Sequence, residues 1–550
     1  MTLSLSPHAG EPAPQSILID VERLTEAYYG LRPDASIPAQ RIAFGTSGHR
    51  GAALESSFNE AHVAAISQAI CDYRAQAGID GPLFIGIDTH ALSRPAFMSA
   101  VEVFAGNGVQ TMIDEGDGYT PTPVVSHAIL RHNLNRTAGF ADGVVISPSH
   151  NPPDQGGFKY NPAHGGPAGS EVTSWIERVA NDLMKRGLRG VRRVPFAQAR
   201  RAPCVHRHDF TGPYVDSLAD IVDMDAIRAS GLRIGIDPLG GAAAQYWTPV
   251  IERYGINATL VNDAIDPTFA FMTLDWDGKI RMDCSSSYAM ARLVAMRERF
   301  DIAFATDTDA DRHGIVCPSA GLLAPNQYLV AACAYLLAHR PFWRGGAAIG
   351  ATMVSSAMIG RMAQSFDRDL YETPVGFKWF SSRFLEGGLA FAGEESAGAT
   401  FLKRDGSVWT TDKDGLVLGL LGAEMTARTG LDPKQFHDKS SAPLGHAWYA
   451  RTDAAASKSE KDLLGALSAD RLAMRSLAGE IVEEVLDKAP GNGQPLGGVK
   501  VVSKGGWFAA RPSGTEDVYK IYAESFHGDA HLQEIQADAQ AAIARVFKRG

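Results

Sequence analysis

Short apolar runs followed by longer segments of helical spacing recur along the chain. Two of the runs are nearly the same, Leu83–Asp88 (LFIGID) and Leu232–Asp237 (LRIGID). Each is short enough for a buried strand, and the segment after it carries apolar residues at helical intervals. These segments, Arg94–Gly108 and Ala242–Tyr254, end at or next to a glycine, which is a common helix stop. The pattern therefore predicts strands alternating with helices, as in an α/β fold.

A looser third copy lies at Ala347–Thr352 and is followed by helical spacing over Ser355–Phe366. The aspartates that end the first two copies, Asp88 and Asp237, are 149 residues apart. Repeats at domain-sized intervals indicate three related α/β domains. Because a strand followed by a helix is common in any α/β protein, the phrases alone leave an unrelated arrangement equally open.

The last hundred residues have a different pattern. The stretch Asp432–Ser459 is polar and broken, which predicts a linker, and a second Gly/Pro-rich stretch follows at Ala489–Gly498. Beyond it the spacing predicts three strands and a closing helix: Val499–Val502, Trp507–Ala510, Val518–Ser525 and Asp529–Lys548. This order predicts a separate α+β domain.

The predicted architecture is three related mixed-sheet α/β domains and a C-terminal α+β domain around a central cleft. A polar, proline-rich arm with one short helix near Val21–Tyr29 precedes them. A chain of 550 residues is long enough for three or four domains of ordinary size. We place the arm at 1–40, the first domain at 41–207 and the second at 208–322. The third then covers 323–440, and the fourth covers 441–550.

Composition narrows the class of protein. Hydrophobic residues make up 45% of the chain and charged residues 21%, as in ordinary globular proteins. With 52 Lys and Arg against 62 Asp and Glu, the formal charge is −10. An acidic chain is a poor match for general nucleic-acid binding, so we expect no nucleic-acid partner.

Cysteine usage and the apolar runs predict a cytoplasmic location. The five cysteines are an odd number without C-x-x-C spacing, which argues against a disulfide framework or a zinc site. The N-terminal residues lack the basic and apolar regions of a secretory signal. The purest apolar run, Leu329–Ala338, is ten residues long and too short to span a bilayer. We therefore expect no membrane partner.

A candidate nucleophile follows the predicted strand Val144–Ile146. The chain continues as Ser-Pro-Ser-His-Asn-Pro-Pro, so prolines restrict the backbone on both sides of Ser149. Lys159 lies ten residues further on and offers a cation or, if its pKa is depressed, a proton acceptor. The alternative is a Pro/Asn turn with an incidental serine, because neighbours such as Ser149 and His150 rarely form a nucleophile–base pair.

A candidate cation site follows the predicted strand Ile302–Ala305. Asp307, Asp309 and Asp311 alternate along the loop and could converge on one hard cation, Mg²⁺ or Ca²⁺. An EF-hand starting at Asp307 would need Gly and Glu where Arg312 and Pro318 stand. A DxDxT phosphatase loop would need Thr or Val in place of Asp311. Both alternatives fail, and repulsion among three carboxylates favours a bound cation over a bare turn.

Three further segments are weaker on their own. Gly393–Gly398 (GEESAG) carries groups that suit a polyol, and Arg511–Glu516 (RPSGTE) has the parts of a phosphate cradle without being a Walker A loop. Phe44–Gly51 (FGTSGHRG) combines small residues with a histidine and an arginine. On its own, the first is better explained as an exposed polar turn, and the other two are equally well explained as turns. Nucleophile, cation site, polyol binder and phosphate cradle nevertheless occur once in each predicted domain, which favours a shared site.

The order FGTSGHRG, SPSHNPP…GFKYNP, DTDADRHG, PVGFKWF, GEESAG, TTDKDG and ARPSGTED resembles the α-D-phosphohexomutase superfamily. It is most similar to bacterial phosphoglucomutases specific for α-D-glucose phosphates, from about residue 40 to the C-terminus. The resemblance implies three related α/β domains and a fourth domain of another type. It also implies a hexose phosphate substrate, one Mg²⁺ per active site, and glucose 1,6-bisphosphate as activator and intermediate.

The resemblance assigns a role to each candidate residue. Ser149 would be the phosphoserine, with Lys159, Arg50 and His150 as further catalytic residues and Lys159 as the hypothetical general base. Asp307, Asp309, Asp311 and a phosphoserine oxygen would hold the metal. The implied substrate-binding residues are Arg312, Lys378, Glu394, Ser396, Lys413, Arg511, Ser513, Gly514 and Thr515.

The implied activity is the reversible interconversion of α-D-glucose 1-phosphate and glucose 6-phosphate by an isomerase. A phosphomannomutase or a dual-specificity mutase is the alternative within the class. A metal-dependent phosphatase and a non-catalytic sugar-phosphate sensor are the alternatives outside it. A monomer and a homodimer are both compatible with the sequence.

Two departures from the family pattern bear on the site. Relatives often carry proline where Thr308 stands and a bulkier residue at Ala310, which predicts a slightly less rigid metal loop. Cys284 and Ser287, in RMDCSSSY, stand where some relatives have proline, and we expect this segment to lie away from the chemistry.

Overall fold

The computed structural model describes residues 5–45, 48–514 and 517–549. The chain divides into two compact units. The N-terminal unit holds Ser6–Leu323 and Ala397–Asp432, and the C-terminal unit holds Ala324–Ser396 and Pro433–Gly550 with the first residues of the chain. In the described parts of the chain, no helix is both long and apolar enough to cross a bilayer.

The N-terminal arm is ordered around one helix. The short helices η1 (Gln15–Ile17) and η2 (Pro38–Gln40) flank α1 (Val21–Gly30), which confirms the helix predicted there. The side chain of Asp20 accepts a hydrogen bond from the backbone N–H of Arg23 at 3.0 Å and caps the helix. The apolar face of α1 then packs into the core of the first domain through Leu24 and Tyr28.

The first domain is a six-stranded mixed sheet in the order β1-β5-β4-β2-β3-β6. Strands β4, β2, β3 and β6 are parallel, and β5 is antiparallel to both β4 and β1. Every residue of β2 and β4 is buried, because helices cover both faces of the sheet. The strands are β1 (His49–Ala52), β2 (Leu83–Ile87), β3 (Thr111–Asp114), β4 (Asp142–Ile146), β5 (Gln155–Asn161) and β6 (Val205–His208). The helices are α2 (Glu60–Ala77), α3 (Ser93–Gly106), α4 (Thr122–Asn133), α5 (Ser170–Lys185) and α6 (Phe196–Ala199).

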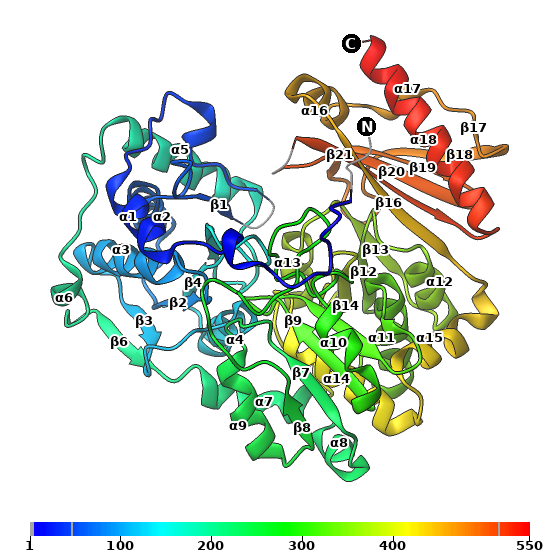
Figure 1. Ribbon diagram of the computed structural model, residues 1–550, viewed down its shortest axis with the longest axis horizontal. Helices are drawn as coiled ribbons and strands as arrows, with labels where there is room; N and C mark the ends of the chain where they lie inside the picture. The colour runs from blue at the N-terminus through cyan, green and yellow to red at the C-terminus, as the bar shows by residue number, and fades with distance from the viewer. Residues whose placement is uncertain (1–4, 46–47, 515–516, 550) are drawn as a thin grey trace. The chain divides into compact units, whose positions relative to one another are not determined.

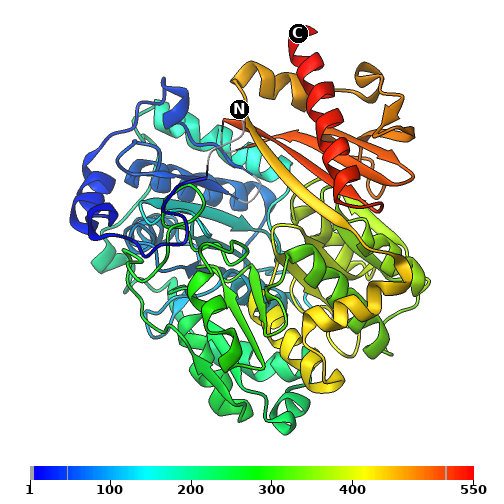
Figure 2. The same ribbon diagram turned by 45° about the vertical axis from the view of Figure 1, so that its right-hand side comes forward.

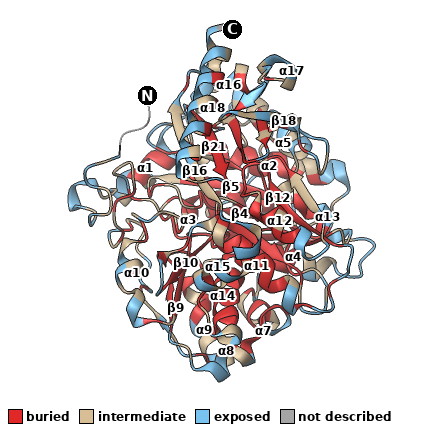
Figure 3. Cartoon of the chain, turned by 90° about the vertical axis from the view of Figure 1, so that its right-hand side faces the viewer, coloured by how far each residue is buried: buried red, intermediate tan, exposed pale blue. Residues whose placement is uncertain are grey.

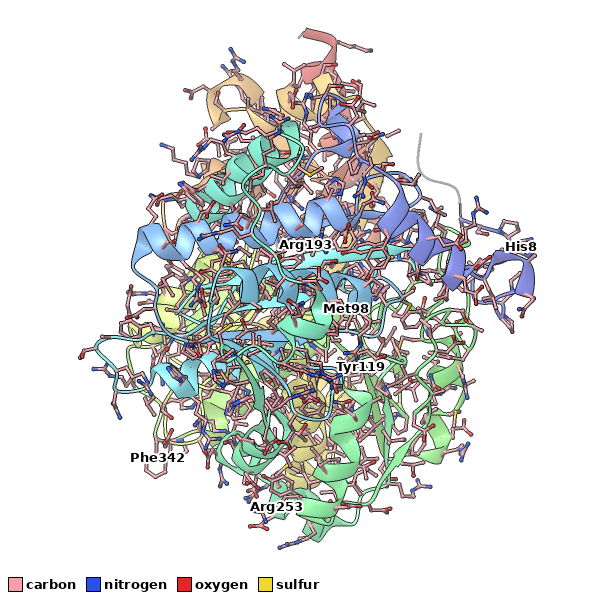
Figure 4. All side chains as sticks on the ribbon, turned by 90° about the vertical axis from the view of Figure 1, so that its left-hand side faces the viewer. His8, Met98, Tyr119, Arg193, Arg253 and Phe342 are labelled. Carbon is pink, nitrogen blue, oxygen red and sulfur yellow. The ribbon has the colours of Figure 1, made fainter. Side chains whose placement is uncertain are left out.

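The long connection between α5 and β6 is fastened by ion pairs. Arg193, labelled in Figure 4, donates to Glu60 of α2 at 2.9 Å and also pairs with Glu102 of α3. Glu102 accepts a second hydrogen bond, from the backbone N–H of Phe196 at 2.7 Å. A segment rich in exposed arginine is therefore held against the helical layer at defined points.

The second domain repeats this arrangement with five strands in the order β11-β10-β9-β7-β8. Strands β9, β7 and β8 are parallel, and β10 is antiparallel to β9. The strands are β7 (Ile234–Asp237), β8 (Ala258–Leu260), β9 (Ile302–Thr306), β10 (His313–Cys317) and β11 (Gly321–Leu322). Its helical segments are α7 (Thr211–Ile221), α8 (Met224–Ser230), α9 (Ala244–Tyr254), α10 (Ala291–Ala295) and η3 (Arg297–Arg299).

The third domain has the same core of three parallel strands. They are β12 (Ala348–Thr352), β13 (Leu370–Thr373) and β14 (Leu389–Glu394), in the order β13-β12-β14. In all three domains the first of these strands is central, the second lies on one side of it and the third on the other. This confirms the predicted repeat of α/β domains. The accompanying helices are α11 (Pro325–His339), α12 (Met358–Ser365), α13 (Lys378–Leu385) and α15 (Pro433–Ser441).

The fourth domain is an antiparallel sheet in the order β16-β21-β20-β19-β18-β17. Helix α18 (Asp529–Arg549, red in Figures 1 and 2) lies across one face and buries Ile535, Ala539 and Ile543 against it. This confirms the predicted α+β domain. The strands are β16 (Trp448–Ala455), β17 (Ser476–Leu477), β18 (Glu480–Lys488), β19 (Pro495–Ser503), β20 (Gly506–Pro512) and β21 (Val518–Ser525). The other helical segments are η4 (Ala442–Leu444), α16 (Lys458–Gly465) and α17 (Ala469–Leu472).

The linker predicted at Asp432–Ser459 is wrong. Helix α15 and strand β16 occupy most of this stretch, and β16 pairs in register with β21 from Trp448↔Ser525 to Ala455↔Val518. The residues of β16 are only half-buried or exposed, so the strand carries polar side chains without an apolar run. The charged strand β18 was missed for the same reason.

Helix α14 (Gly415–Thr429), which follows β15 (Gly398–Phe401), brings a distant part of the sequence to the second domain. It packs on β9 and β10, and Figure 3 shows these elements as buried. A Cβ added at Gly419 would collide with the ring of Phe304 on β9. The helix therefore needs a residue without a side chain at this contact.

Replacing Gly419 with alanine should lower the melting temperature, because the added methyl group overpacks this contact by about 1–3 kcal/mol. Gly30→Ala is the matched control, since Gly30 ends α1 and an added Cβ meets no heavy atom within 4 Å. Thermal unfolding followed by circular dichroism measures both variants. Equal melting temperatures for the two variants would contradict the packing argument.

Asp237, at the end of β7, is a buried carboxyl group whose pKa is raised to about 6 by burial. Its folded pKa lies above its unfolded one, so the folded state carries the proton up to about pH 6. The free energy of unfolding therefore falls by on the order of 3 kcal/mol as the pH rises through the folded pKa. Asp237→Asn should raise the melting temperature at pH 8, and the gain should shrink towards pH 4.5. A gain that is independent of pH would contradict the raised pKa.

Candidate active site

Ser149 lies in the loop that follows β4, at the carboxyl end of a parallel strand. It is 1% exposed, and its φ of 59° lies in the left-handed region that residues other than glycine rarely adopt. Its backbone N–H donates to Ser147 Oγ at 2.8 Å, and its carbonyl accepts from Thr308 Oγ1 at 2.6 Å. Both sides of the strained residue are therefore held by neighbouring hydroxyls.

The hydroxyl of Ser149 faces a carboxylate and an imidazole. It donates to Asp307 Oδ2 at 2.7 Å and lies 3.3 Å from His150 Nδ1. Burial and the charge of Arg312 hold the pKa of His150 well below its usual range, so the imidazole is neutral. The structure thus brings Ser149, His150 and Asp307 together.

The three aspartates converge as predicted. One carboxylate oxygen from each of Asp307, Asp309 and Asp311 lies within 4.8 Å of the others, and all three side chains are buried. Ala310, between the last two, has a φ of 57° and turns the loop. Among the described residues, Asp309 Oδ1 and Asp311 Oδ1 have no hydrogen-bond partner although they are buried. Buried orphan oxygens on three converging carboxylates fit a hard divalent cation such as Mg²⁺.

Cationic side chains surround the carboxylates. Lys413 Nζ lies 3.2 Å from Asp311 Oδ2, and Arg312 Nε lies 3.8 Å from Asp311 Oδ1. Although burial alone would raise it, the pKa of Asp311 is lowered by the charges of Lys413, Lys159 and Arg312. Burial and the charges of its two partner aspartates raise the pKa of Asp307. Lys413, expected to bind substrate, is therefore part of the cluster around the metal loop.

Lys159 is carried back to the site by the hairpin of β4 and β5. The antiparallel register pairs Lys159 with Val145, and its Nζ lies 2.5 Å from Asp309 Oδ2 and 3.4 Å from Asp311 Oδ2. Burial would lower the pKa of Lys159, but these two carboxylates raise it above the usual value. A general-base role therefore requires the carboxylate contacts of Lys159 to be replaced first.

Arg50, on β1, is half-buried, and its side chain contacts the serine loop, residues 147–153. Its Nη1 donates to Asn151 Oδ1 at 3.1 Å. Burial and the charge of Arg312 lower its pKa, which remains far above neutrality for a guanidinium.

The RMDCSSSY segment lies beside the site, which corrects the expectation that it would lie away from the chemistry. The backbone N–H of Met282 donates to the carbonyl of His150 at 3.2 Å. Burial would raise the pKa of Asp283, but its interactions with the neighbouring His150 and with the guanidinium of Arg312 lower it to about 2. Sequence reasoning missed Asp283 because neither its spacing nor its neighbours mark it as part of the site.

The candidate sugar and phosphate residues belong to the C-terminal unit. Glu394 ends β14, is 6% exposed, and accepts from the backbone N–H of Gly376 at 3.0 Å. Lys378 begins α13, and burial lowers its pKa. Ser396 is half-buried in the loop after β14.

The phosphate-cradle candidates lie in the turn between β20 and β21. Arg511 is near the end of β20, and the backbone N–H of Ser513 donates to the carbonyl of Val518 at 2.9 Å. Gly514 is exposed, with no heavy atom within 4 Å of an added Cβ. Thr515 lies outside the described residues.

Comparison with known proteins identifies the family. The models of phosphoglucomutase/phosphomannomutase match the chain in four segments: alpha/beta/alpha domain I at 41–186, domain II at 212–321, domain III at 324–442 and the C-terminal domain at 468–542. The chain is 59% identical to a phosphoglucomutase of Komagataeibacter xylinus over 546 residues, which is 99% of this chain and 98% of that protein.

Two solved structures share the fold. Parafusin, a phosphoglucomutase from Paramecium, has a TM-score of 0.72 at 18% identity and covers 94% of this chain and 96% of its own. The N-acetylphosphoglucosamine mutase of Aspergillus fumigatus, solved with GlcNAc-6P and magnesium, has a TM-score of 0.52 at 14% identity and covers 96% and 99%. With four matching domains in order and a full-length relative at 59% identity, the chain belongs to the phosphoglucomutase/phosphomannomutase family.

Proposed function

We propose that the chain is an isomerase that interconverts α-D-glucose 1-phosphate and glucose 6-phosphate through a phosphoserine. The observation that carries the proposal is the buried Ser149 hydroxyl, held 2.7 Å from Asp307 of the three-carboxylate loop. The 59% identity to a bacterial phosphoglucomutase over the full chain supports the same activity.

In the proposed reaction the phosphoryl group leaves Ser149 Oγ and joins the free hydroxyl of the sugar phosphate. The P–Oγ bond breaks, a new P–O bond forms, the sugar hydroxyl loses its proton, and Ser149 Oγ, which keeps the bonding electron pair, takes up a proton. This yields glucose 1,6-bisphosphate, which reorients and returns its other phosphoryl group to Ser149. The left-handed backbone of Ser149 and the hydroxyls on either side hold the reacting oxygen in place, which is how positioning lowers the barrier.

We propose Lys159 as the proton acceptor; the family resemblance implies a base or a charge partner at this position. Its ammonium is paired with Asp309 and Asp311. It can therefore act as a base only after another cation has replaced it beside those carboxylates. The neutral His150, 3.3 Å from Ser149 Oγ, is the second candidate. Arg50 and Arg312 supply fixed positive charge, which favours a phosphoryl group at this position.

The metal proposed is one Mg²⁺ per active site, held by Asp307, Asp309, Asp311 and an oxygen of phosphorylated Ser149. When bound, the ion neutralises charge on the transferring phosphoryl group. The orphan oxygens of Asp309 and Asp311 support this, as does the magnesium with which the Aspergillus fumigatus mutase was solved. Lys413 and Arg312 would balance the remaining charge of the loop.

The substrate-binding roles follow the resemblance. Glu394 and Ser396 are proposed to bind sugar hydroxyls, and Lys378 to contact the substrate. Arg511, Ser513, Gly514 and Thr515 are proposed to bind the phosphate that is not reacting. The domain limits 41–207, 208–322, 323–440 and 441–550, a cytoplasmic location, and a monomer or homodimer are proposed with them.

Ser149→Ala should lower mutase turnover by at least about 10³-fold, because the phosphoryl acceptor is lost. The assay supplies Mg²⁺, a trace of the matching hexose 1,6-bisphosphate, and either α-glucose 1-phosphate or α-mannose 1-phosphate. It follows the 6-phosphate and free phosphate together. Ser67→Ala is the matched control, since Ser67 is a buried serine of α2 whose hydroxyl has no hydrogen-bond partner in the described chain.

Each alternative predicts a different result in this assay. Comparable rates on mannose would indicate a dual-specificity mutase with the same mechanism. Free phosphate without 6-phosphate would identify a phosphatase and contradict the proposal. Binding of the sugar phosphate without phosphorylation of Ser149 would identify a sensor.

Asp309→Asn should abolish the stabilisation that Mg²⁺ or Mn²⁺ gives, because it removes one of three ligands. For the unaltered protein, a cation at 100 times its Kd should stabilise the fold by about 2.7 kcal/mol. Thermal unfolding and electron paramagnetic resonance of Mn²⁺ measure the effect without substrate. Asp237→Asn, a buried aspartate outside the cluster, should still bind one ion. Equal binding by the two variants would contradict the assigned site.

A further inference from the structure

Asp88, which follows β2, is a buried carboxylate that accepts hydrogen bonds on both of its oxygens. It is 0% exposed. Its Oδ2 accepts from Ser147 Oγ at 2.6 Å and from His90 Nδ1 at 2.8 Å, and Thr308 Oγ1 lies 2.9 Å from it. Its Oδ1 accepts from Ser93 Oγ at 2.5 Å and from the backbone N–H of His90 at 3.1 Å.

His90 is bonded on both sides of its ring. Nδ1 faces Asp88, and Nε2 lies 3.0 Å from the carbonyl oxygen of Asn151. Carboxylate and carbonyl oxygens only accept, so both ring nitrogens must donate and the ring carries a positive charge. Asp88 and His90 thus form a buried ion pair whose second nitrogen reaches the serine loop.

The donors to Asp88 are the groups that hold the backbone of Ser149. Ser147 Oγ, bonded to Asp88, accepts the N–H of Ser149 at 2.8 Å. Thr308 Oγ1 holds the other side of the residue: its single proton is shared between the carbonyl of Ser149 at 2.6 Å and Asp88 Oδ2 at 2.9 Å, in a three-centre hydrogen bond. The carbonyl of Asn151, two residues on, is held by His90. One carboxylate therefore fixes the loop on three sides.

Thr308 also joins this network to the metal loop, since it stands between Asp307 and Asp309. The family pattern, with proline at this position in many relatives, predicts a less rigid metal loop when the residue is threonine. Its hydroxyl instead bonds to the serine loop, so the two loops share an anchor.

We propose that Asp88, paired with His90, is a positioning residue that holds Ser149 in its left-handed conformation and ties the serine loop to the metal loop through Thr308. The inference rests on the proposed phosphoryl transfer at Ser149. Asp88 does not touch the reacting atoms, and it acts through the hydroxyls of Ser147 and Thr308.

The repeated fold supplies a matched comparison. Asp237 ends the equivalent strand β7 in the phrase LRIGID, as Asp88 ends LFIGID, and it too is buried. Its Oδ1 accepts from the backbone N–H of Leu239 at 2.9 Å. The same position in a sister domain thus caps its own turn, whereas Asp88 has gained contacts to a catalytic loop.

The first experiment compares Asp88→Asn with Asp237→Asn at saturating Mg²⁺. Asp88→Asn should lower kcat by roughly 10- to 100-fold, because misplacement of a nucleophile by about 1 Å has an effect of this size. KM should change by less than about 3-fold, since the substrate-binding residues are untouched. Asp237→Asn should keep kcat within about 2-fold of the unaltered enzyme.

The second experiment tests the hydroxyl of Thr308 and guards against a variant that fails to fold. Thr308→Ser keeps the hydroxyl and should keep kcat within about 3-fold, whereas Thr308→Val removes it and should lower kcat by roughly 10-fold or more. If the serine variant loses as much as the valine variant, the hydroxyl is not the anchor and the proposal is wrong. If Asp88→Asn matches Asp237→Asn, the proposal is also wrong.

Hydrogen exchange separates this inference from the proposed function. The amide of Ser149, bonded to Ser147, should exchange faster in Asp88→Asn than in Asp237→Asn, whether or not the enzyme turns over substrate. Unaltered protein without mutase activity would refute the proposed function alone. Unchanged exchange at residues 147–151 would refute the positioning role alone.

Discussion

The N-terminal unit depends on three carboxylates held together in a buried place. Like charges within 4.8 Å repel strongly where water is excluded, so the surrounding residues must compensate. Lys159, Lys413 and Arg312 do so from three different segments of the chain. The same charge balance leaves two carboxylate oxygens without hydrogen-bond partners among the described residues, which is what a site for a divalent cation requires. For stability the carboxylates of this loop need neighbouring positive charge, whereas binding of a cation needs carboxylate oxygens that are left without a partner.

The repeat explains where the chemistry lies. Ser149 follows β4, the three aspartates follow β9, and Glu394 ends β14 with Ser396 just after it. Each of these strands is the third parallel strand of its domain. The carboxyl ends of parallel strands present loop residues at one edge of the sheet. The same position thus carries the candidate nucleophile, the candidate cation site and a carboxylate with a hydroxyl in the three related domains. The differences in function come from the loop residues, because the strands themselves are alike.

Much of this could be predicted from the sequence, and what could not has physical reasons. Apolar periodicity located β2, β7 and β12, and the loops after β4 and β9 carried recognisable residues. Polar strands were missed, because β16 and β18 have no buried run to mark them. The positions of Lys413 beside Asp311 and of Asp88 beneath Ser149 depend on contacts between residues that are far apart in the chain. No local pattern encodes such contacts.

Helix α14 has a consequence for the order in which the protein folds. Gly419 and Phe304 are in contact across 115 residues of sequence, and the chain between them includes most of the third α/β domain. During synthesis, β9 and β10 emerge long before the helix that covers them, so their apolar surface stays open meanwhile. Lys413 arrives with the same segment. The charge balance of the metal loop is thus completed late, when most of the polypeptide has already left the ribosome.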